Sequence, residues 1–330
     1  MDHSFLMSTE FVEEFADVLK EKVVVYLNVD LVPSNITLSV STVPTLYRAA
    51  VDASKVVKNP LDNKLTVFDS WLEHYPPKTD WLQGVPEMRI PGGGSDHFTF
   101  LTFLGIPVMD FSYKNPKSSG YSNPLYHSRY ELPFANEQIF DNNHLAVHKA
   151  VGEYWAELAR LFADSPLLPI SATTFAHRFL ADYLEGIKKP ILSLNSQFPN
   201  DTEPAKSQLD NLIKNAHQFM AQAEAFEREQ SANANLEWAN VRLRKLDQCF
   251  VNPSMGIARE EPLKRHVLFA ASKDNFYASN TMAMVYKKIG QLRKANNGTE
   301  RAIRANELAL ELAVVQQAVR CAVNTLGKGI

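Results

Sequence analysis

The sequence predicts an α/β domain over residues 1–165 followed by an all-α helical domain over residues 166–330. The chain of 330 residues exceeds the usual single-domain range of roughly 100–200 residues, so two domains are expected. Helix and strand patterns alternate through the first half, whereas only helical periodicity follows Pro166. The composition, with 45% hydrophobic residues, 22% charged residues and 13 glycines, is that of an ordinary globular chain.

The first half begins with a helix and two strands. Apolar residues recur at helical spacing over residues 9–22, and the β-branched run at residues 23–29 predicts a strand buried on both faces of a parallel sheet. Asp30 follows this strand at its carboxyl end, where open α/β sheets place their ligand sites. Residues 36–42 alternate like a second, more exposed strand, and residues 45–57 predict a helix.

A glycine-rich loop follows in the middle of the first half. Residues 91–97 read Pro-Gly-Gly-Gly-Ser-Asp-His, and glycines let a backbone approach a ligand closely. The loop lacks the Lys-Ser/Thr pair of a phosphate-binding loop, so that function is not expected. The later elements predicted for this half are a short helix at residues 98–104, a strand at residues 106–113, a polar loop at residues 114–130 and a helix at residues 144–162.

Two long amphipathic helices are predicted in the second half. Apolar residues such as Leu209, Leu212, Ala216 and Phe219 recur at i, i+3, i+4 and i+7 within residues 205–230, which predicts a helix in a bundle. Residues 299–326 predict a last helix that is long enough to pack along a partner helix or a second subunit.

The charge balance and the cysteines argue against several classes of function. The 34 basic and 37 acidic side chains give a net charge of −3, which offers no electrostatic support for binding nucleic acid. The apolar runs are too short to span a bilayer, so no membrane segment is expected. Cys249 and Cys321 match no CxxC metal or redox pattern, and we expect buried free thiols rather than a disulfide.

The N-terminus and the glycosylation motifs lead to different expectations about secretion. Residues 1–10 lack the basic and apolar regions of a signal peptide, so no export signal is expected. Asn35, Asn200 and Asn297 each begin an Asn-x-Ser/Thr motif, and glycan addition at such motifs requires the secretory lumen. The sequence leaves both expectations open.

Several polar residues could take part in chemistry. His127 lies in a polar loop and could bind a metal or transfer a proton, although a surface histidine is the simpler interpretation. Asp30 could bind a ligand at the end of its strand or only cap a helix or turn. Asp96 and His97 follow the glycines and could face a ligand or form a plain tight turn.

Motifs spaced along nearly the whole chain resemble those of one known family. In the first half they are Ser8-Thr-Glu-Phe11, Tyr26-Leu-Asn-Val-Asp30, Gly94-Ser-Asp-His97, Leu104-Gly-Ile106 and the stretch from Tyr121 to Glu131; in the second half they are Phe250-Val-Asn-Pro253, Arg265-His-Val-Leu-Phe269 and Asn275-Phe-Tyr277. Together they resemble the glutamate carboxypeptidase II family of two-zinc peptidases, also called N-acetylated alpha-linked acidic dipeptidases, whose architecture is shared with the transferrin receptor. The resemblance implies a partial zinc-exopeptidase α/β sandwich followed by a transferrin receptor-like helical domain that forms a homodimer.

The resemblance also implies two zinc ions, but only part of their ligand set. In the family the ions are held by two His, a bridging Asp, a second Asp and a Glu, with a general-base Glu directly before the ligand Glu. Asp30 matches the second Asp and His127 the second His, whereas the Glu pair falls on Met1 and Asp2. The first His and the bridging Asp would lie upstream of residue 1. We therefore expect a weak, incomplete zinc site of Asp30, His127 and Asp2 that has no general base.

Substrate contacts implied by the resemblance fall on Ser95, Asp110, Tyr126 and Tyr277. Tyr126 would help to polarise the peptide carbonyl. Asp110 and Ser112 stand where glutamate-specific members carry arginines, and Phe276 stands where the family carries the lysine of a Lys-Tyr pair. An acidic peptide substrate is therefore not expected, and neutral peptides or peptides with a free amino terminus would fit Asp110 better.

The sequence thus predicts the C-terminal portion of a zinc-dependent exopeptidase that is inactive as an isolated chain. A pair of catalytic metal ions about 4 Å apart needs a bridging carboxylate, and loss of the general base alone costs roughly 10²–10⁴ in rate. The alternative is a non-catalytic, transferrin receptor-like dimeric binding protein. The family also implies a cell-surface or extracellular protein held by an upstream anchor, which these residues do not contain.

Overall fold

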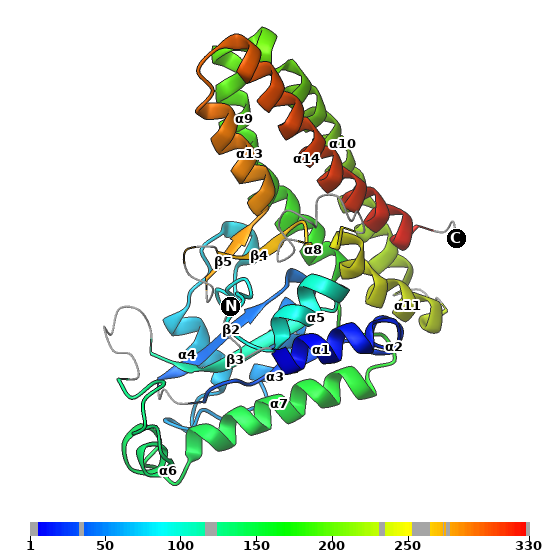
Figure 1. Cartoon of the computed structure of the whole chain (residues 1–330). Helices are drawn as coiled ribbons and strands as arrows, with labels where there is room; N and C mark the ends of the chain where they lie inside the picture. Colours follow the sequence, from blue (N-terminus) through cyan, green and yellow to red (C-terminus); the bar gives the residue numbers. More distant parts are fainter. Residues whose placement is uncertain are drawn as a thin grey trace. The chain divides into compact units, whose positions relative to one another are not determined.

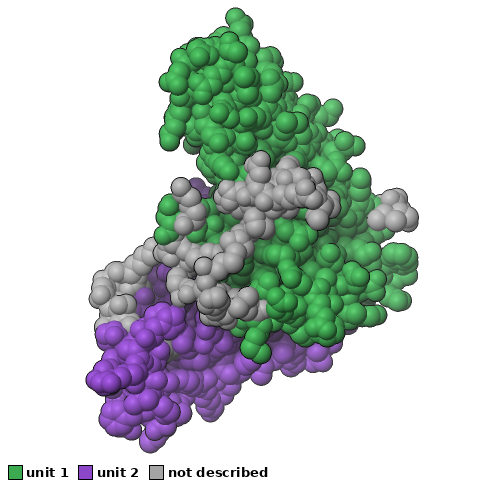
Figure 2. All heavy atoms as spheres, in the orientation of Figure 1, with its two compact units in different colours: residues 1–24, 92–107, 171–330 green, residues 25–91, 108–170 purple. Residues whose placement is uncertain are grey.

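The computed structural model contains two compact units, which interleave along the chain. Figure 2 shows them in different colours: a sheet unit of residues 25–91 and 108–170, and a bundle unit of residues 1–24, 92–107 and 171–330. The residues that the structure describes are 6–32, 36–115, 124–230, 235–252, 265–272, 274 and 278–327.

The sheet unit contains a three-stranded sheet. Strands β1 (Tyr26–Asn28), β2 (Thr37–Thr42) and β3 (Val108–Lys114) lie in the order β1-β3-β2, with β1 parallel and β2 antiparallel to β3. The predicted strands are confirmed, although β1 is shorter than expected. Their predicted burial is wrong: β1 lies at an edge of the described sheet and is mostly half-buried, whereas β2 is almost fully buried. The reason is that β3 takes the central position and a helix packs on β2.

Alternation along the strands gives the sheet one apolar face and one polar face. On the apolar face, Phe111 of β3 contacts Tyr154 of helix α7 (Ala146–Asp164), with ring centroids 4.9 Å apart. The Tyr154 hydroxyl donates to the carbonyl oxygen of Ala50 in helix α3 (Tyr47–Ser54) at 3.1 Å. These buried contacts attach both helices to the sheet, and the two helices confirm the predictions for residues 45–57 and 144–162.

Helix α4 (Val67–His74) packs on β2 and is absent from the sequence prediction. It begins with a capping box, in which the Thr66 hydroxyl accepts from the Asp69 N–H at 3.3 Å and the Asp69 carboxylate accepts from the Thr66 N–H at 2.7 Å. Such a cap contributes about 1 kcal/mol. The other short elements of this unit are η2 (Pro44–Leu46), η3 (Asp80–Leu82), α6 (Pro133–Ala135) and η5 (Asn136–Phe140).

The bundle unit is mainly helical (Figure 1). Its helices are α1 (Leu6–Glu14), α2 (Ala16–Lys22), α5 (His97–Leu104), α8 (Ala172–Arg178), η6 (Phe179–Leu184), α9 (Glu185–Gln197), α10 (Pro199–Gln230), α11 (Leu236–Leu246), η7 (Asp247–Phe250), α13 (Ala283–Arg293) and α14 (Gly298–Leu326). It also contains a small antiparallel sheet of β4 (Phe269–Ala271) and β5 (Ser279–Thr281), which the prediction of helices alone did not include.

The core of the bundle unit lies between α10 and α14, which run side by side in Figure 1. Leu212 and Phe219 of α10 and Leu312 and Val319 of α14 are fully buried. The Gln316 amide of α14 donates to Asn215 of α10 at 2.7 Å, which adds a polar link between the helices. Both long helices predicted from hydrophobic periodicity are therefore confirmed.

The predicted N-terminal helix is divided into α1 and α2, and most of its apolar face is exposed. Leu19 is buried, whereas Phe11, Phe15 and Val18 are 47%, 42% and 59% exposed. The Phe11 and Phe15 rings contact each other with centroids 5.0 Å apart. Helical spacing therefore predicted helical structure for these residues, but it did not predict the exposure of their apolar face.

The expectation of two free thiols is wrong, because Cys249 and Cys321 form a disulfide. Cys249 lies in η7 and Cys321 lies in the last turns of α14. These elements pack against each other, which places the two Cα atoms 5.5 Å apart despite the separation of 72 residues in sequence. Short metal and redox patterns in the sequence do not reveal a pairing that depends on this long-range packing.

No helix among the described residues is both long and apolar enough to cross a bilayer.

Candidate functional site

The polar face of the sheet brings an amide and a carboxylate together at the end of β1. Asn28 pairs with Asp110 in the parallel register of β1 and β3, and the Asn28 amide donates to the Asp110 carboxylate at 2.8 Å. Asn28 is buried, whereas Asp110 is half-buried. Asp30 follows two residues later and is exposed, so the expected position at the carboxyl end of the strand is confirmed.

Lys114 adds a positive charge to the same face. It lies four residues after Asp110 on β3, and an even spacing along a strand places both side chains on one face. Burial lowers the pKa of Lys114 from its usual value, while Asp110 raises it, Arg89 lowers it and Asp30 raises it again. The two aspartates therefore offset part of the cost of burying this ammonium group.

Ser112 lies between Asp110 and Lys114 on this face and is buried. Its hydroxyl oxygen has no hydrogen-bond partner among the described residues. A buried hydroxyl without a partner costs about 1–3 kcal/mol, which makes it a group that a bound molecule could satisfy. We name Asn28, Asp30, Asp110, Ser112 and Lys114 the polar strand cluster.

Tyr126 and His127 form an exposed turn in the same unit. Their rings stack with centroids 3.8 Å apart, and the His127 N–H donates to the Glu131 carboxylate at 3.0 Å. His127 has a φ of 57°, a left-handed conformation that is uncommon outside glycine. These local contacts fix the turn and leave the His127 side chain on the surface, as the simpler interpretation from sequence supposed.

The described residues do not fit a zinc site. No three His, Cys, Asp or Glu side chains within the described ranges come together as a metal-binding group, so Asp30 and His127 have no third ligand there. Asp2, the third expected ligand, lies outside the described residues. A protein zinc site requires at least three such ligands, so Asp30 and His127 are too few to hold the ion by themselves.

The remaining expected substrate and glycan residues are distributed over different parts of the chain. Ser95 is buried in the bundle unit, where its carbonyl accepts from the Phe98 N–H at 3.1 Å, whereas Asp110 and Tyr126 belong to the sheet unit. Tyr277 and Asn35 lie outside the described residues. Asn200 and Asn297 are exposed, and the Asn297 side chain caps α14 by accepting from the Glu300 N–H at 2.8 Å.

The glycine-rich loop has a structural histidine at its end. His97 is buried at the start of α5, and its Nε2 atom lies 3.1 Å from the carbonyl oxygen of Gly92. Asp96 occupies the N-cap position of α5 without a side-chain capping bond. The tight-turn interpretation of these two residues therefore has direct structural support.

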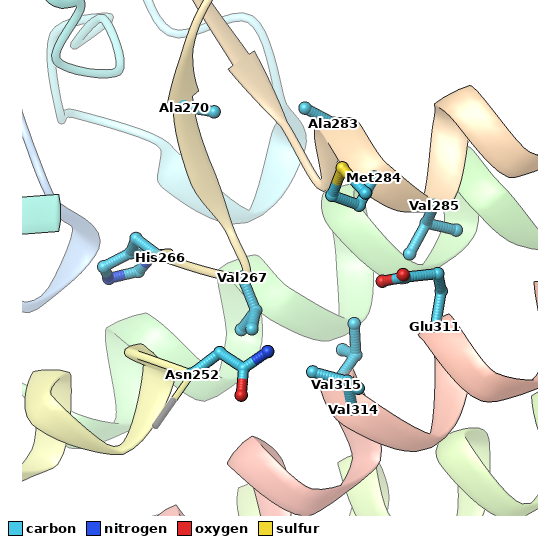
Figure 3. Close-up of a pocket in the computed structure, with 10 residues that line it drawn as sticks. All are labelled: Asn252, His266, Val267, Ala270, Ala283, Met284, Val285, Glu311, Val314 and Val315. Atoms are coloured by element: carbon cyan, nitrogen blue, oxygen red, sulfur yellow. The ribbon is translucent and has the colours of Figure 1, made fainter. Parts of the chain in front are cut away.

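A small cavity in the bundle unit is a second candidate (Figure 3). It holds about 20 Å³, enough for one water molecule. Its wall includes the buried carboxylate of Glu311, which points from α14 toward Val267 in Figure 3, and the buried His266. Burial lowers the pKa of His266 to about 3, so this ring is neutral. The cavity is too small for a peptide or a cofactor.

Sequence reasoning missed three members of the polar face: Asn28, Arg89 and Lys114. The sequence predicts Lys114 in the following loop, although its even spacing from Asp110 places it on the same face once the strand is extended by one residue. Asn28 is likewise an even number of residues from Asp30, so the two side chains are expected on the same face of the chain. Arg89 lies beside β2 through a single bridge to Ser41, for which no local sequence pattern exists.

The fold and the polar strand cluster together define a class of protein: a mixed α/β protein with a helical domain and a polar site at the carboxyl end of a parallel strand. A family model for the transferrin receptor-like dimerisation domain matches residues 200–327. The chain is 39% identical over 335 aligned positions to the glutamate carboxypeptidase 2 homolog of Caenorhabditis elegans, covering 97% of this chain and 42% of that protein. It is 28% identical to the aminopeptidase NAALADL1 of Mus musculus, over 97% of this chain and 42% of that protein.

The chain therefore belongs to the glutamate carboxypeptidase and transferrin receptor-like family, and it corresponds to the C-terminal portion of that family. It spans less than half the length of these relatives. A plant relative, the probable glutamate carboxypeptidase LAMP1 of Arabidopsis thaliana, is 26% identical over 89% of this chain and 40% of its own length.

Proposed function

We propose that these residues form the C-terminal part of a zinc-dependent exopeptidase subunit, in which the polar strand cluster contributes substrate contacts and the helical bundle contributes self-association. The observation that carries this proposal is the polar strand cluster, because it combines a hydrogen-bonded carboxylate, a half-buried cation and a buried hydroxyl at one sheet face. Peptides carry groups that complement these three: an amino terminus, a carboxylate and backbone amides. The carboxypeptidase and aminopeptidase names of the relatives support the same reaction class.

The substrate that fits the cluster is a peptide without an acidic side chain at the bound position. Asp110 would repel a glutamate side chain, whereas a neutral residue or a free ammonium group could lie beside it. Lys114 already balances part of the Asp110 charge. A neutral group beside Asp110 therefore does not leave that charge uncompensated. Ser112 can donate to a peptide carbonyl. Tyr126, Ser95 and Tyr277 remain proposed contacts from the family resemblance.

We further propose that a polypeptide of these 330 residues does not hydrolyse peptides by itself. Asp30 and His127 supply two zinc ligands at most among the described residues, and a third, Asp2, is proposed from the family resemblance alone. The proposed base position is occupied by Met1, which cannot accept a proton from water. Weak zinc binding without turnover is the expected state of this polypeptide.

The test combines a peptidase assay with calorimetric titration of zinc. We expect no zinc-dependent release of an amino acid from acidic, neutral or amino-blocked dipeptides, and weak zinc binding that His127→Ala reduces further. His144→Ala is the matched control, because His144 is also exposed and also has a positive φ of 53°. Turnover that a chelator abolishes would contradict the inactivity, and tight binding unchanged by His127→Ala would contradict the role of His127.

The alternative function is a non-catalytic dimeric binding protein, and the lack of a three-ligand group among the described residues favours it. The same titration separates the two candidates. No zinc binding by the wild type, together with a stable dimer, would support the binding protein. Zinc binding that depends on His127 would support the peptidase origin of the site.

Glycosylation and an extracellular location are part of the proposal. The Cys249–Cys321 disulfide supports folding in an oxidising compartment, where Asn-x-Ser/Thr motifs are also modified. Asn297 uses its oxygen for the helix cap, which leaves its nitrogen available for a glycan. Expression in a eukaryotic secretory system with a supplied leader should give a glycosidase-sensitive mass shift that decreases in Asn200→Gln and Asn297→Gln.

A further inference from the structure

The Cys249–Cys321 disulfide is accessible to small solutes. Both cysteines line a groove of the bundle unit that has a volume of about 930 Å³. Each cysteine is half-buried, whereas the residues that follow them in the chain, Phe250 and Ala322, are fully buried. Exchange with a thiol requires access to a sulfur atom, and exposed disulfides are the labile or regulatory ones. This bond therefore has the access that an exchangeable disulfide needs.

A buried hydroxyl group lies beside both sulfur atoms. The Thr325 Oγ1 atom is 3.3 Å from the Cys249 sulfur and 4.0 Å from the Cys321 sulfur, and Thr325 is 9% exposed. A disulfide sulfur carries no hydrogen, so the hydroxyl is the donor of this contact and the nearer sulfur is the better acceptor. The Thr325 hydroxyl therefore stabilises negative charge on the Cys249 sulfur more than on the Cys321 sulfur.

Two cationic side chains line the same groove, and its described lining contains no acidic residue. Lys20 lies in α2, where its carbonyl oxygen accepts from the side-chain amide of Gln248, the residue before Cys249, at 2.9 Å. The Arg265 guanidinium lies over the Phe103 ring, 4.8 Å from its centroid, and its Nε atom has no hydrogen-bond partner among the described residues. Positive charges attract anions and stabilise thiolates. The groove therefore favours a negatively charged reactant and a thiolate leaving group.

We propose that this disulfide is a modification site for a small thiol that carries a negative charge, which enters the groove and forms a mixed disulfide with Cys321. The incoming thiolate attacks the Cys321 sulfur, so a new sulfur–sulfur bond forms as the Cys249–Cys321 bond breaks. The electron pair of the broken bond goes to the Cys249 sulfur, where the Thr325 hydroxyl donates to the resulting thiolate and water then protonates it. The incoming sulfur is oxidised and the Cys249 sulfur is reduced, so the step needs no other reactant.

The exchange removes a covalent restraint from the bundle unit. The disulfide joins η7 to the last turns of α14, and after exchange these elements are held together by packing alone. The adduct on Cys321 carries its negative charge into the groove that Lys20 and Arg265 line. Attack by the Cys249 thiolate on the mixed disulfide restores the original bond and releases the thiol, so the modification is reversible.

Two thiols of similar size test the preference for negative charge. Mercaptoethanesulfonate is an anion, whereas mercaptoethanol is neutral. The exchange rate of each thiol with the folded full chain is divided by its rate with a small neutral disulfide, which removes differences in intrinsic nucleophilicity. We expect the sulfonate to react several-fold faster at low ionic strength, with a preference that decreases as salt screens the charges. Equal normalised rates would overturn the preference, and exchange only after urea has unfolded the chain would overturn the site.

Charge variants test whether the preference arises in the groove. Lys20→Gln and Arg265→Gln should each bring the normalised rate of the sulfonate closer to that of the neutral thiol. Lys22→Gln is the matched control, because Lys22 is an exposed cation of the same helix as Lys20 and does not line the groove. Circular dichroism verifies the fold of each variant. An equal loss of preference in Lys22→Gln and Lys20→Gln would overturn recognition by the groove.

Mass spectrometry identifies the sulfur that receives the adduct. After a brief reaction with the sulfonate, the free thiol is blocked with N-ethylmaleimide and the chain is digested. We expect the sulfonate adduct on Cys321 and the maleimide on Cys249, and the reverse pattern would overturn the direction of attack. Thr325→Val removes the hydroxyl from a side chain of similar shape, so the folded variant should exchange several-fold more slowly with both thiols. An unchanged rate would overturn the role of Thr325.

Discussion

Asn28 and Asp110 face each other across the parallel pair of β1 and β3, and the amide nitrogen of Asn28 donates to the Asp110 carboxylate at 2.8 Å. Hydrogen bonds to a charged group contribute about 1.5–3 kcal/mol, more than neutral pairs do. The bond also selects one register, because a shift of β1 by one residue would turn Asn28 to the opposite face of the sheet, away from Asp110. Asn28 therefore orients the carboxylate at the centre of the polar strand cluster.

Asn28→Asp should destabilise the sheet unit. The change places two carboxylates at hydrogen-bond distance, so we expect a loss of about 1–3 kcal/mol at pH 7 that decreases as the pH falls toward 4. Urea unfolding at both pH values measures this. The exchange variant Asn28→Asp, Asp110→Asn restores an amide–carboxylate pair and should recover most of the stability; if it does not, the bond is not the cause.

His266 should make the protein less stable in mild acid. Its pKa is lowered to about 3 in the folded protein by burial, whereas an unfolded histidine has a pKa of about 6.5. Below pH 6.5 the unfolded state binds the proton and the folded state does not. The unfolding free energy contributed by this residue therefore decreases by up to about 1.4 kcal/mol for each pH unit, until the pH approaches the folded pKa.

His266→Asn isolates this contribution. The side-chain oxygen of asparagine can accept from the Leu268 and Phe269 N–H groups, which Nδ1 of His266 accepts at 3.2 Å each. Urea unfolding of both proteins between pH 7 and pH 5 should show a steeper loss of stability for the wild type. Parallel curves would contradict a neutral buried His266.

Loss of the disulfide should destabilise the bundle unit. Removing a native disulfide typically costs about 2–5 kcal/mol, because the unfolded chain gains conformational freedom. Cys249→Ser, Cys321→Ser should therefore unfold at a lower urea concentration than the wild type. A reductant should bring the wild type to the same midpoint and leave the double variant unchanged. A wild type that is insensitive to reductant would contradict the bond.

Gly105 should not tolerate alanine. It ends α5 with a φ of 65°, and a Cβ atom there would lie 2.6 Å from the Cα atom of Gln248. Left-handed backbone and backbone overlap both oppose the substitution, so a loss of at least about 1–2 kcal/mol is expected. Gly290→Ala is the control: Gly290 lies inside α13 with no atom near the added Cβ, and alanine should stabilise it by up to about 1 kcal/mol. Thermal unfolding of both variants measures the contrast.

Most of the long regular elements could be predicted from the sequence, because the apolar residues that recur at regular spacing form the buried faces of these helices and strands. The helix at residues 298–326 and the strand at residues 108–114 are predicted within two residues, and the helix at residues 199–230 is predicted with a start six residues too late. Helix α4 and the strands β4 and β5 were missed. Each is too short to show a period, and α4 is stabilised by a capping box and by packing on β2 rather than by its own pattern.

The candidate site was predicted only in part. The strand pattern located Asp30, and the family motifs located Asp110 and His127. The partners of these residues depend on which strands become neighbours: Asn28 meets Asp110 only because β1 pairs with β3. The disulfide has the same origin, since η7 and α14 are brought together by the bundle. Long-range pairing of this kind has no local signature in a single sequence.

The bond between Cys249 and Cys321 closes the intervening chain into a covalent ring. A protease that cuts once anywhere inside this ring produces two pieces that stay joined through sulfur. Such a nicked molecule migrates with the intact one in an unreduced gel and gains only the mass of one water. Preparations judged without a reducing agent would therefore overstate the fraction of intact chains.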